Sequence, residues 1–227
     1  MSYQFSFTWL ERYWPLLIDG AVQTVWMTVI VITVGFVLGT VCAVASASRF
    51  RVLRILVQLY VDVIRNTPLL VQLFLVYFGF ASLGLRFSPD TSALIGLTIN
   101  VGAYSSEIIR AGIQSIHKGQ LEAADTLGLN RFQRLMRVIL PPAIEKVYPA
   151  LASQYVLLML STSIASQISA EELTAAASRI QSITYRSFEV FLVILVIYLL
   201  LSFAMRGLLY LLSLLVFARK RRLRTNL

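Results

Sequence analysis

Polar and ionisable side chains interrupt the long apolar runs of this sequence at a small number of positions. Such side chains are costly within a membrane, so they usually face a cavity or a partner. Asp62 and Arg65 lie three residues apart, as do Glu107 and Arg110, so each pair can share one helix face. The polar residues that we predict along a passage for a solute are Arg65, Thr67, Pro68, Gln72, Asn100, Tyr104, Glu107, Ser161, Thr162 and Ser163.

Bonding within the protein is the alternative for each of these side chains. The two charged pairs can neutralise their own charges along a helix. Amide groups more often bond across helices than bind a solute, which applies to Gln72, Asn100 and Gln154. The hydroxyls at 161–163 can bond back to carbonyls of their own helix. Both interpretations remain open at this point.

Several kinds of chemistry are absent from the sequence. The single histidine, His117, adjoins Lys118 and is typical of a surface loop. The single cysteine, Cys42, lies in an apolar run, so there is no disulfide framework or cysteine-based metal site. No stretch has the form GxxxxGK[ST], so the chain does not bind ATP by that motif. We therefore predict no catalytic, cofactor-binding or metal-binding residue, and no enzyme activity of the chain itself.

A charged, amphipathic stretch, Glu122–Pro141, stands between long apolar runs. The residues from 121 to 127 favour a short helix, and Gly128 can supply its left-handed C-terminal cap. Asn130 can cap a second helix with apolar residues at helical spacing. We expect Pro141 and Pro142 to end that second helix. Such a loop is suited to docking against a soluble partner, although a plain solvated loop is the alternative.

The composition is that of an integral membrane protein. Of the 227 residues, 58% are hydrophobic and 14% are charged, and the mean hydropathy is +0.76. Soluble domains hold about 25% charged residues. The net charge of +9 does not indicate nucleic-acid binding, because the basic residues cluster at the ends of apolar runs.

Five stretches are long and apolar enough to cross a membrane as helices, which predicts an all-α fold. They lie at about 21–47, within 55–85, and at 91–111, 147–168 and 189–210. Pro68 predicts a break in the second, and residues 55–66 lie either within the membrane or along its surface. The aromatic residues of 1–20 predict an interfacial segment. Residues 21–217 would form the transmembrane domain, with a cytoplasmic loop at about 112–146 and a basic tail at 218–227.

The distribution of lysine and arginine predicts the orientation. Basic residues gather after the first span, between the third and fourth, and at the end of the chain. The positive-inside rule places these regions in the cytoplasm, with the N-terminus outside and the C-terminus inside. The basic tail is then suited to anionic lipid headgroups.

The charged stretch also resembles a known motif, in which Glu-Ala-Ala is followed at fixed spacing by glycine, an aliphatic residue and Leu-Pro. Here those positions are Glu122, Ala123, Ala124, Gly128, Val138, Leu140 and Pro141. The motif is that by which the membrane subunits of bacterial ABC importers contact their ATPases. The resemblance implies a type I importer permease fold and a coupling helix. The residues that it implies for ATPase coupling are Gly119, Glu122, Ala123, Ala124, Asp125, Leu127, Gly128, Leu140 and Pro141.

Two further stretches, Ile64–Phe78 and Ala103–Gly119, are similar to permeases for polar amino acids, of the histidine, glutamate, glutamine, arginine and opine group. The likeness covers roughly residues 16–217. It implies a bacterial inner-membrane importer with two ABC ATPase subunits, an external amino-acid-binding protein, and a second permease that is either a copy or a paralogue. ATP and magnesium would bind to the ATPases and not to this chain.

Two other functional classes differ in what they require. A stand-alone carrier or channel would need intramembrane carboxylates for an ion relay, and Asp62 and Glu107 are the candidates. A membrane-embedded enzyme would need a cluster of histidine, carboxylate or serine side chains, which a single loop histidine does not favour.

Overall fold

The computed structural model describes residues 4–48 and 50–217. Arg49 and the predicted basic tail at 218–227 lie outside the described residues, so the lipid role of that tail stays a prediction. The described residues form helices and no strand, as predicted. The labelled helices are α1 (Trp9–Ser46), α2 (Arg51–Arg65), α3 (Leu69–Phe74), α4 (Phe80–Ser82), α5 (Pro89–Gln114), α6 (Lys118–Thr126), α7 (Arg131–Gln133), α8 (Leu140–Ser161), α9 (Leu173–Thr184) and α10 (Ser187–Val216).

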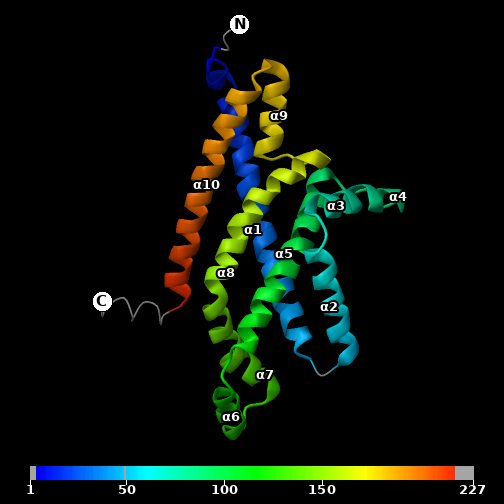
Figure 1. Cartoon of the computed structure of the whole chain (residues 1–227), viewed down its shortest axis with the longest axis vertical. Coiled ribbons are helices and arrows are strands. Elements are labelled where there is room, and N and C mark those ends of the chain that lie inside the picture. The colour runs from blue at the N-terminus through cyan, green and yellow to red at the C-terminus, as the bar shows by residue number, and fades with distance from the viewer. Residues whose placement is uncertain (1–3, 49, 218–227) are drawn as a thin grey trace.

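Within the described part of the chain, three helical segments depart from α-helical geometry and join or extend these helices. Leu75–Gly79 and Arg134–Ile139 are π-helical, and Thr162–Ile168 is a 3₁₀ helix that continues α8. Helices α1, α5, α8 and α10 run along the long axis of the molecule (Figure 1). The α6–α7 turn lies at one end of that axis, and α9 lies at the other end with the N-terminus (Figure 1).

Among the described residues, three helical stretches are long and apolar enough to cross a membrane: Trp9–Ser46, Arg131–Ile168 and Ser187–Val216. They contain the expected first, fourth and fifth spans. The expected third span corresponds to α5, whose 26 residues extend about 39 Å and are long enough to cross. Helix α5 is more polar than the other spans, and its polar side chains can be packed against neighbouring helices: Ser92, Ser105 and Ser106 are all buried.

The expected second span is bent at Pro68. Helix α2 and the Leu69–Ser82 stretch meet at 110°, and only together do they qualify as a fourth candidate span. The break lies at Asn66–Pro68, as predicted, because proline lacks an amide hydrogen and disfavours helix at the preceding residue. Beyond the bend, α3 and α4 project sideways from the bundle (Figure 1).

The N-terminal part of the chain differs from the expectation of a separate segment over 1–20. Helix α1 begins at Trp9 and continues without interruption to Ser46, so no boundary lies at residue 20. Pro15 lies inside the helix, at its seventh residue, where the missing amide hydrogen removes one backbone hydrogen bond but does not end the helix. The interfacial position of residues 9–20 stays a prediction.

Helix α9 was not predicted from the sequence. The Glu172 carboxylate caps it by accepting hydrogen bonds from the amides of Thr174 and Ala175 at 2.9 and 2.7 Å, and from the Tyr198 hydroxyl at 2.7 Å. Burial raises the pKa of the Glu172 carboxyl from its ordinary value, and these hydrogen bonds oppose the rise. The buried face of α9 packs on α1 and α10 in a second apolar core.

Among the described helices, α1 and α5 make the most extensive packing contact, and glycine allows them to approach closely. A Cβ built on Gly39 would lie 2.6 Å from the Ser105 Cβ and 2.9 Å from both the Gly102 carbonyl oxygen and the Ser106 amide nitrogen. A Cβ on Gly35 would clash with the side chain of Val101. The two helix backbones therefore approach closely through a small-residue pair four positions apart.

We predict that Gly39→Val destabilises the protein by about 1–3 kcal/mol, because the α5 backbone must move to accept the side chain. Gly207→Val is the matched control, since a Cβ on Gly207 of α10 meets nothing within 4 Å. Thermal unfolding of the two variants in detergent measures the difference. Equal midpoints for both variants would show that the α1–α5 contact does not need glycine.

Candidate functional site

The first candidate site is the turn formed by α6, Gly128, α7 and the π-helical Arg134–Ile139, here named the coupling segment (residues 118–139). Its first helix, α6, is capped by His117, whose Nδ1 accepts a hydrogen bond from the Gly119 amide at 3.2 Å. Ala124 is buried, whereas Glu122 and Ala123 are exposed. The buried side of α6 packs against the rest of the coupling segment, including the π-helical residues 134–139, and its exposed side is accessible to a partner.

The turn after α6 depends on Gly128, which has φ of +68°. The amides of Gly128 and Leu129 donate to the carbonyls of Asp125 and Ala124, at 3.0 and 3.2 Å. This left-handed C-terminal cap is as predicted. A Cβ at Gly128 would meet nothing within 4 Å, so glycine is required for backbone conformation and not for space.

The second helix of the segment begins at a capping box. Asn130 Oδ1 accepts from the Gln133 amide at 2.9 Å, and Gln133 Oε1 accepts from the Asn130 amide at 3.1 Å. This confirms the predicted Asn130 cap.

The expected end of that helix at Pro141 and Pro142 is wrong. The helical path continues through both prolines into α8, so that 131–168 forms one long stretch. The π-helical Arg134–Ile139 precedes the prolines, and they occupy the first turn of α8, where missing amide hydrogens are tolerated. The coupling segment is therefore continuous with a membrane-spanning helix.

An ion pair holds the two parts of the coupling segment together. Arg134 Nη1 lies 2.7 and 3.0 Å from the two carboxylate oxygens of Asp125. Large apolar side chains nearby point outward: Leu127 is 76% exposed, Phe132 70% and Met136 48%. A folded, pinned turn with exposed apolar side chains can dock into a groove of another protein.

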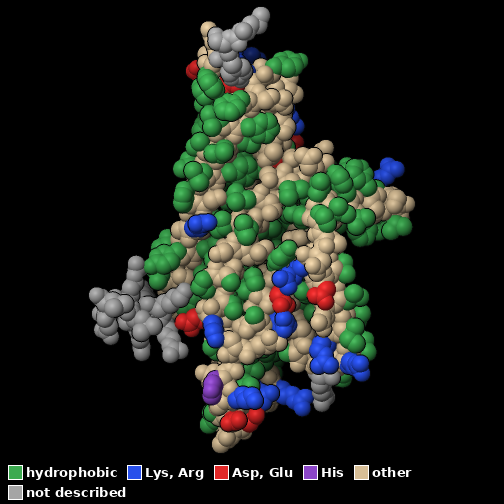
Figure 2. Space-filling model, viewed as in Figure 1, with side chains coloured by type: hydrophobic (Ala, Val, Ile, Leu, Met, Phe, Trp, Pro, Cys, Tyr) green, Lys and Arg blue, Asp and Glu red, His purple; other side chains and the backbone are tan. Residues whose placement is uncertain are grey.

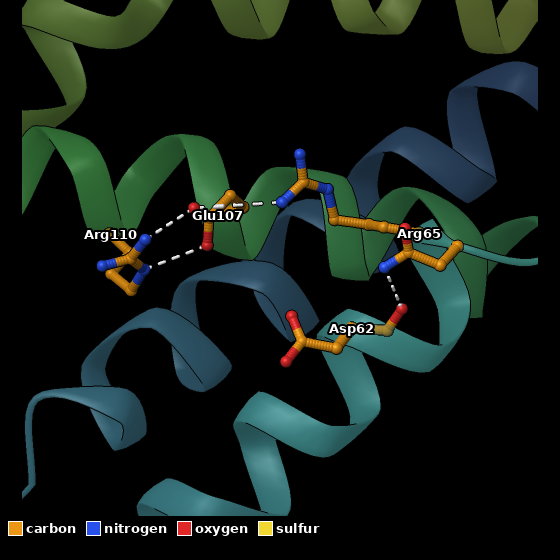
Figure 3. Close-up of polar contacts among 5 residues, drawn as sticks. Asp62, Arg65, Glu107 and Arg110 are labelled. Carbon is orange, nitrogen blue, oxygen red and sulfur yellow. Dashed lines mark hydrogen bonds and ion pairs between the residues drawn. The ribbon is translucent and has the colours of Figure 1, made fainter.

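The second candidate site is an ion cluster between α2 and α5 (Figure 3). Arg110 donates two hydrogen bonds to the Glu107 carboxylate, as expected for this pair. Arg65 of α2 also reaches Glu107, with 3.9 Å between Nη1 and Oε1. Its guanidinium lies 5.5 Å from the centre of the Tyr104 ring. One carboxylate of α5 therefore joins two arginines and holds the end of α2.

The expected Asp62–Arg65 pair is not formed. Arg65 is the last residue of α2 and points to Glu107 on the neighbouring helix (Figure 3). Among the described residues, the Asp62 carboxylate has no ion pair. Asp62, Arg65, Glu107 and Arg110 instead line a cavity of about 290 Å³ between α1, α2 and α5.

The other predicted pathway residues are mostly bonded within the protein. Gln72 Nε2 donates to the Ile64 carbonyl at 2.8 Å and to the Thr67 hydroxyl at 2.8 Å, which bridges the break at Pro68. Asn100 Nδ2 donates to Gln72 Oε1 at 2.9 Å and ties the break to α5. This confirms the interpretation that these amides bond across helices.

The three hydroxyls at the end of α8 also bond locally. Ser161 donates to the Leu157 carbonyl at 2.8 Å, and Thr162 and Ser163 donate to carbonyls three residues back, both at 2.7 Å. They stand where α8 changes to a 3₁₀ helix. Thr162 is buried, and Ser161 and Ser163 are partly exposed. A part in the solute pathway stays a prediction for all three.

Residues 35–217 match the family model of the binding-protein-dependent transport system inner membrane component. The chain belongs to this family. Among curated relatives, the L-cystine transport system permease TcyB of Bacillus subtilis is 40% identical over 94% of this chain and 88% of its own. The nopaline permease NocM of Agrobacterium fabrum is 40% identical over 83% of each chain. The glutamine permease GlnP of Escherichia coli is 35% identical over 92% of this chain and 97% of its own.

Solved structures agree with this assignment. A crystal structure of an amino acid ABC transporter with histidines has a chain that is 36% identical, with a TM-score of 0.85 over 93% of this chain and 99% of that one. The MetNI methionine ABC transporter, in an inward-facing conformation, is 20% identical with a TM-score of 0.74, which shows the shared fold. The chain thus has the type I ABC permease fold, and its relatives are permease subunits of amino acid ABC importers.

Sequence reasoning missed Arg134 as a member of this permease's coupling segment. Its partner Asp125 is nine residues away across a turn, which no helix-spacing rule connects. The exposed Phe132 and Met136 carried a readable signal, since both lie in a helical repeat within a charged stretch.

We predict that Arg134→Ala loosens the coupling segment with little loss of global stability, because exposed ion pairs contribute about 0–1 kcal/mol. Faster amide exchange over 121–129 in hydrogen–deuterium exchange of the purified protein measures the effect. The Asp125→Arg/Arg134→Asp double variant should restore slow exchange. Arg131→Ala is the control, and an equal effect of that change would refute a specific role for the Asp125–Arg134 pair.

Proposed function

We propose that this chain is the permease subunit of an ATP-driven importer for a polar amino acid. The coupling segment is the observation that carries the proposal. It matches the family motif by residue type, and it is a folded element held by two caps and an ion pair. The named substrates of its relatives, cystine, glutamine and nopaline, support an amino acid or amino acid derivative as cargo.

The coupling segment would transmit the ATPase cycle to the membrane helices. Two ATPase subunits would bind ATP and magnesium and receive Leu127, Phe132 and Met136 in a groove. Because α7 and the π-helical residues continue into α8, movement of the docked turn would move α8 as a rigid body. Pro141 and Leu140 would contribute by fixing this junction.

The ion cluster supports a path for a zwitterionic cargo. The carboxylate of an amino acid requires a cation and its amine requires an anion, and the cavity between α2 and α5 offers Arg65, Arg110, Glu107 and Asp62. Gln72, Asn100 and Thr67 would hold the adjoining break open to the path. Ser161, Thr162 and Ser163 would lie at the outer end of α8.

The assembly would contain a second permease, because few spans are available in one chain to enclose a pathway. The coupling segment would lie on the cytoplasmic side of a bacterial inner membrane, and a binding protein would deliver the amino acid at the α9 end. The concentration of Lys and Arg on the coupling-segment half of the molecule supports this orientation (Figure 2).

Substitutions at Gly128 test the coupling role. Gly128→Val should abolish most amino acid uptake without loss of the assembled complex, because a β-branched residue is strained at φ of +68°. Gly128→Asn should retain most uptake, since asparagine tolerates this conformation. Gly128→Asp should also lose uptake, because it adds a negative charge close to Asp125. Uptake of a radiolabelled amino acid mixture by cells with the complete system is the measurement, and wild-type import by the valine variant would overturn the assignment.

Purification of the tagged chain from its native host, with mass spectrometry of co-purifying proteins, tests the partners. A P-loop ATPase should be recovered, and the presence or absence of a second permease sequence distinguishes a heterodimer from a homodimer. Preparations without any ATPase, in a detergent that preserves a known importer, would contradict the proposal.

A further inference from the structure

Arg206 is the one lysine or arginine within α10, and it lies on an otherwise apolar helix. Its side chain is exposed. Within residues 4–48 and 50–217, no ion pair or hydrogen bond involves its guanidinium. A cation on a membrane-spanning helix is costly unless an anion accompanies it, so the partner of Arg206 must come from outside the described chain.

The depth of Arg206 along α10 indicates which anions it can reach. It lies nineteen positions after Ser187 at the start of the helix, which corresponds to about 29 Å of helix. The hydrocarbon core of a bilayer is about 30 Å thick. Arg206 thus lies about one hydrocarbon thickness along α10, a depth at which its long side chain can reach headgroup phosphates, and the helix continues beyond it to Val216.

The surroundings of Arg206 suit a lipid better than a protein carboxylate. Apolar side chains on the same helix are open to the exterior: Phe203 is 60% exposed and Leu208 52%. Figure 2 shows this hydrophobic surface over α10. A cation bordered by exposed hydrocarbon matches an anionic headgroup with its acyl chains alongside.

A cavity of about 300 Å³ between α8 and α10 adjoins Arg206 and is also lined by Tyr148, Ser153, Tyr210 and Ser213. Tyr148 donates its hydroxyl hydrogen to the Leu209 carbonyl at 2.6 Å, and Ser153 and Ser213 donate to carbonyls of their own helices at 3.1 and 2.7 Å. The oxygens of Ser153 and Ser213 carry lone pairs that can accept hydrogen bonds. The cavity therefore suits a headgroup that carries hydroxyl donors beside its phosphate.

We propose that Arg206 and the α8–α10 cavity bind the headgroup of an anionic phospholipid, with the guanidinium on the phosphate and the oxygens of Ser153 and Ser213 accepting from headgroup hydroxyls. Guanidinium binds phosphate through paired N–H donors, which an ammonium does not reproduce. The proposal depends on α10 spanning the membrane and not on the identity of the transported amino acid.

Native mass spectrometry of the delipidated complex, titrated with phosphatidylglycerol or with phosphatidylcholine of the same acyl chains, tests this site. Arg206→Leu should weaken the first phosphatidylglycerol by about tenfold and leave phosphatidylcholine unchanged. Arg206→Lys should weaken it less. Arg86→Leu, which removes an exposed arginine before α5, is the matched control and should bind both lipids as the unmodified protein does.

Unchanged phosphatidylglycerol affinity in Arg206→Leu would overturn the proposal. If the complex of that variant also separates into smaller species, Arg206 is instead the partner of a carboxylate on another subunit. If Arg206→Leu does not assemble, Arg206→Gln keeps the side chain polar while removing its charge, and the same two readings apply to it.

Discussion

The backbone contact between α1 and α5 is the constraint on which the other helices depend. Gly39 brings the two backbones so close that the α5 carbonyl and amide groups near Gly102 and Ser106 form the surface against which α1 lies. Bilayer hydrocarbon offers no hydrophobic drive for helices to associate, so close packing of small residues must supply the attraction. Helices α2 and α8 also pack on α5. Because α5 is surrounded by other helices, it can carry more polar side chains than the other long helices.

Two proline sites use this scaffold in opposite ways. At Pro68 the helix bends by 110°, and the freed carbonyls of Ile64 and Thr67 are satisfied by Gln72, which Asn100 of α5 holds in place. At Pro141 the helix continues, because the preceding π-helical turn accommodates the missing donors. The first site separates two helical directions, and at the second the helical path continues. Both outcomes depend on how the backbone groups around the proline are satisfied.

Local signals in the sequence predicted the parts of the structure that local bonds decide. The cap at Gly128 and the box at Asn130 involve residues within a few positions of one another, so residue type was sufficient. The continuation through Pro141 and Pro142 was not predictable, because it depends on a π-helical turn that no residue signals. Arg65 and Glu107 lie 42 positions apart on two different helices. The rule that residues three apart share a helix face favoured Asp62 as the partner of Arg65 instead.

The continuous path from the coupling segment to the far end of α8 determines how a local change can act at a distance. The stretch 131–168 is helical throughout, from Arg131 through α8 to the 3₁₀ turn that begins at Thr162. Its far end is fixed by packing, because Ala165 and Ile168 are buried against the α1–α5 core. Packed interiors have low compressibility, so this end of the stretch cannot move without moving its neighbours. A movement of the coupling segment that reaches α8 therefore acts on α5, and the α1–α5 contact provides the surface against which α8 would move.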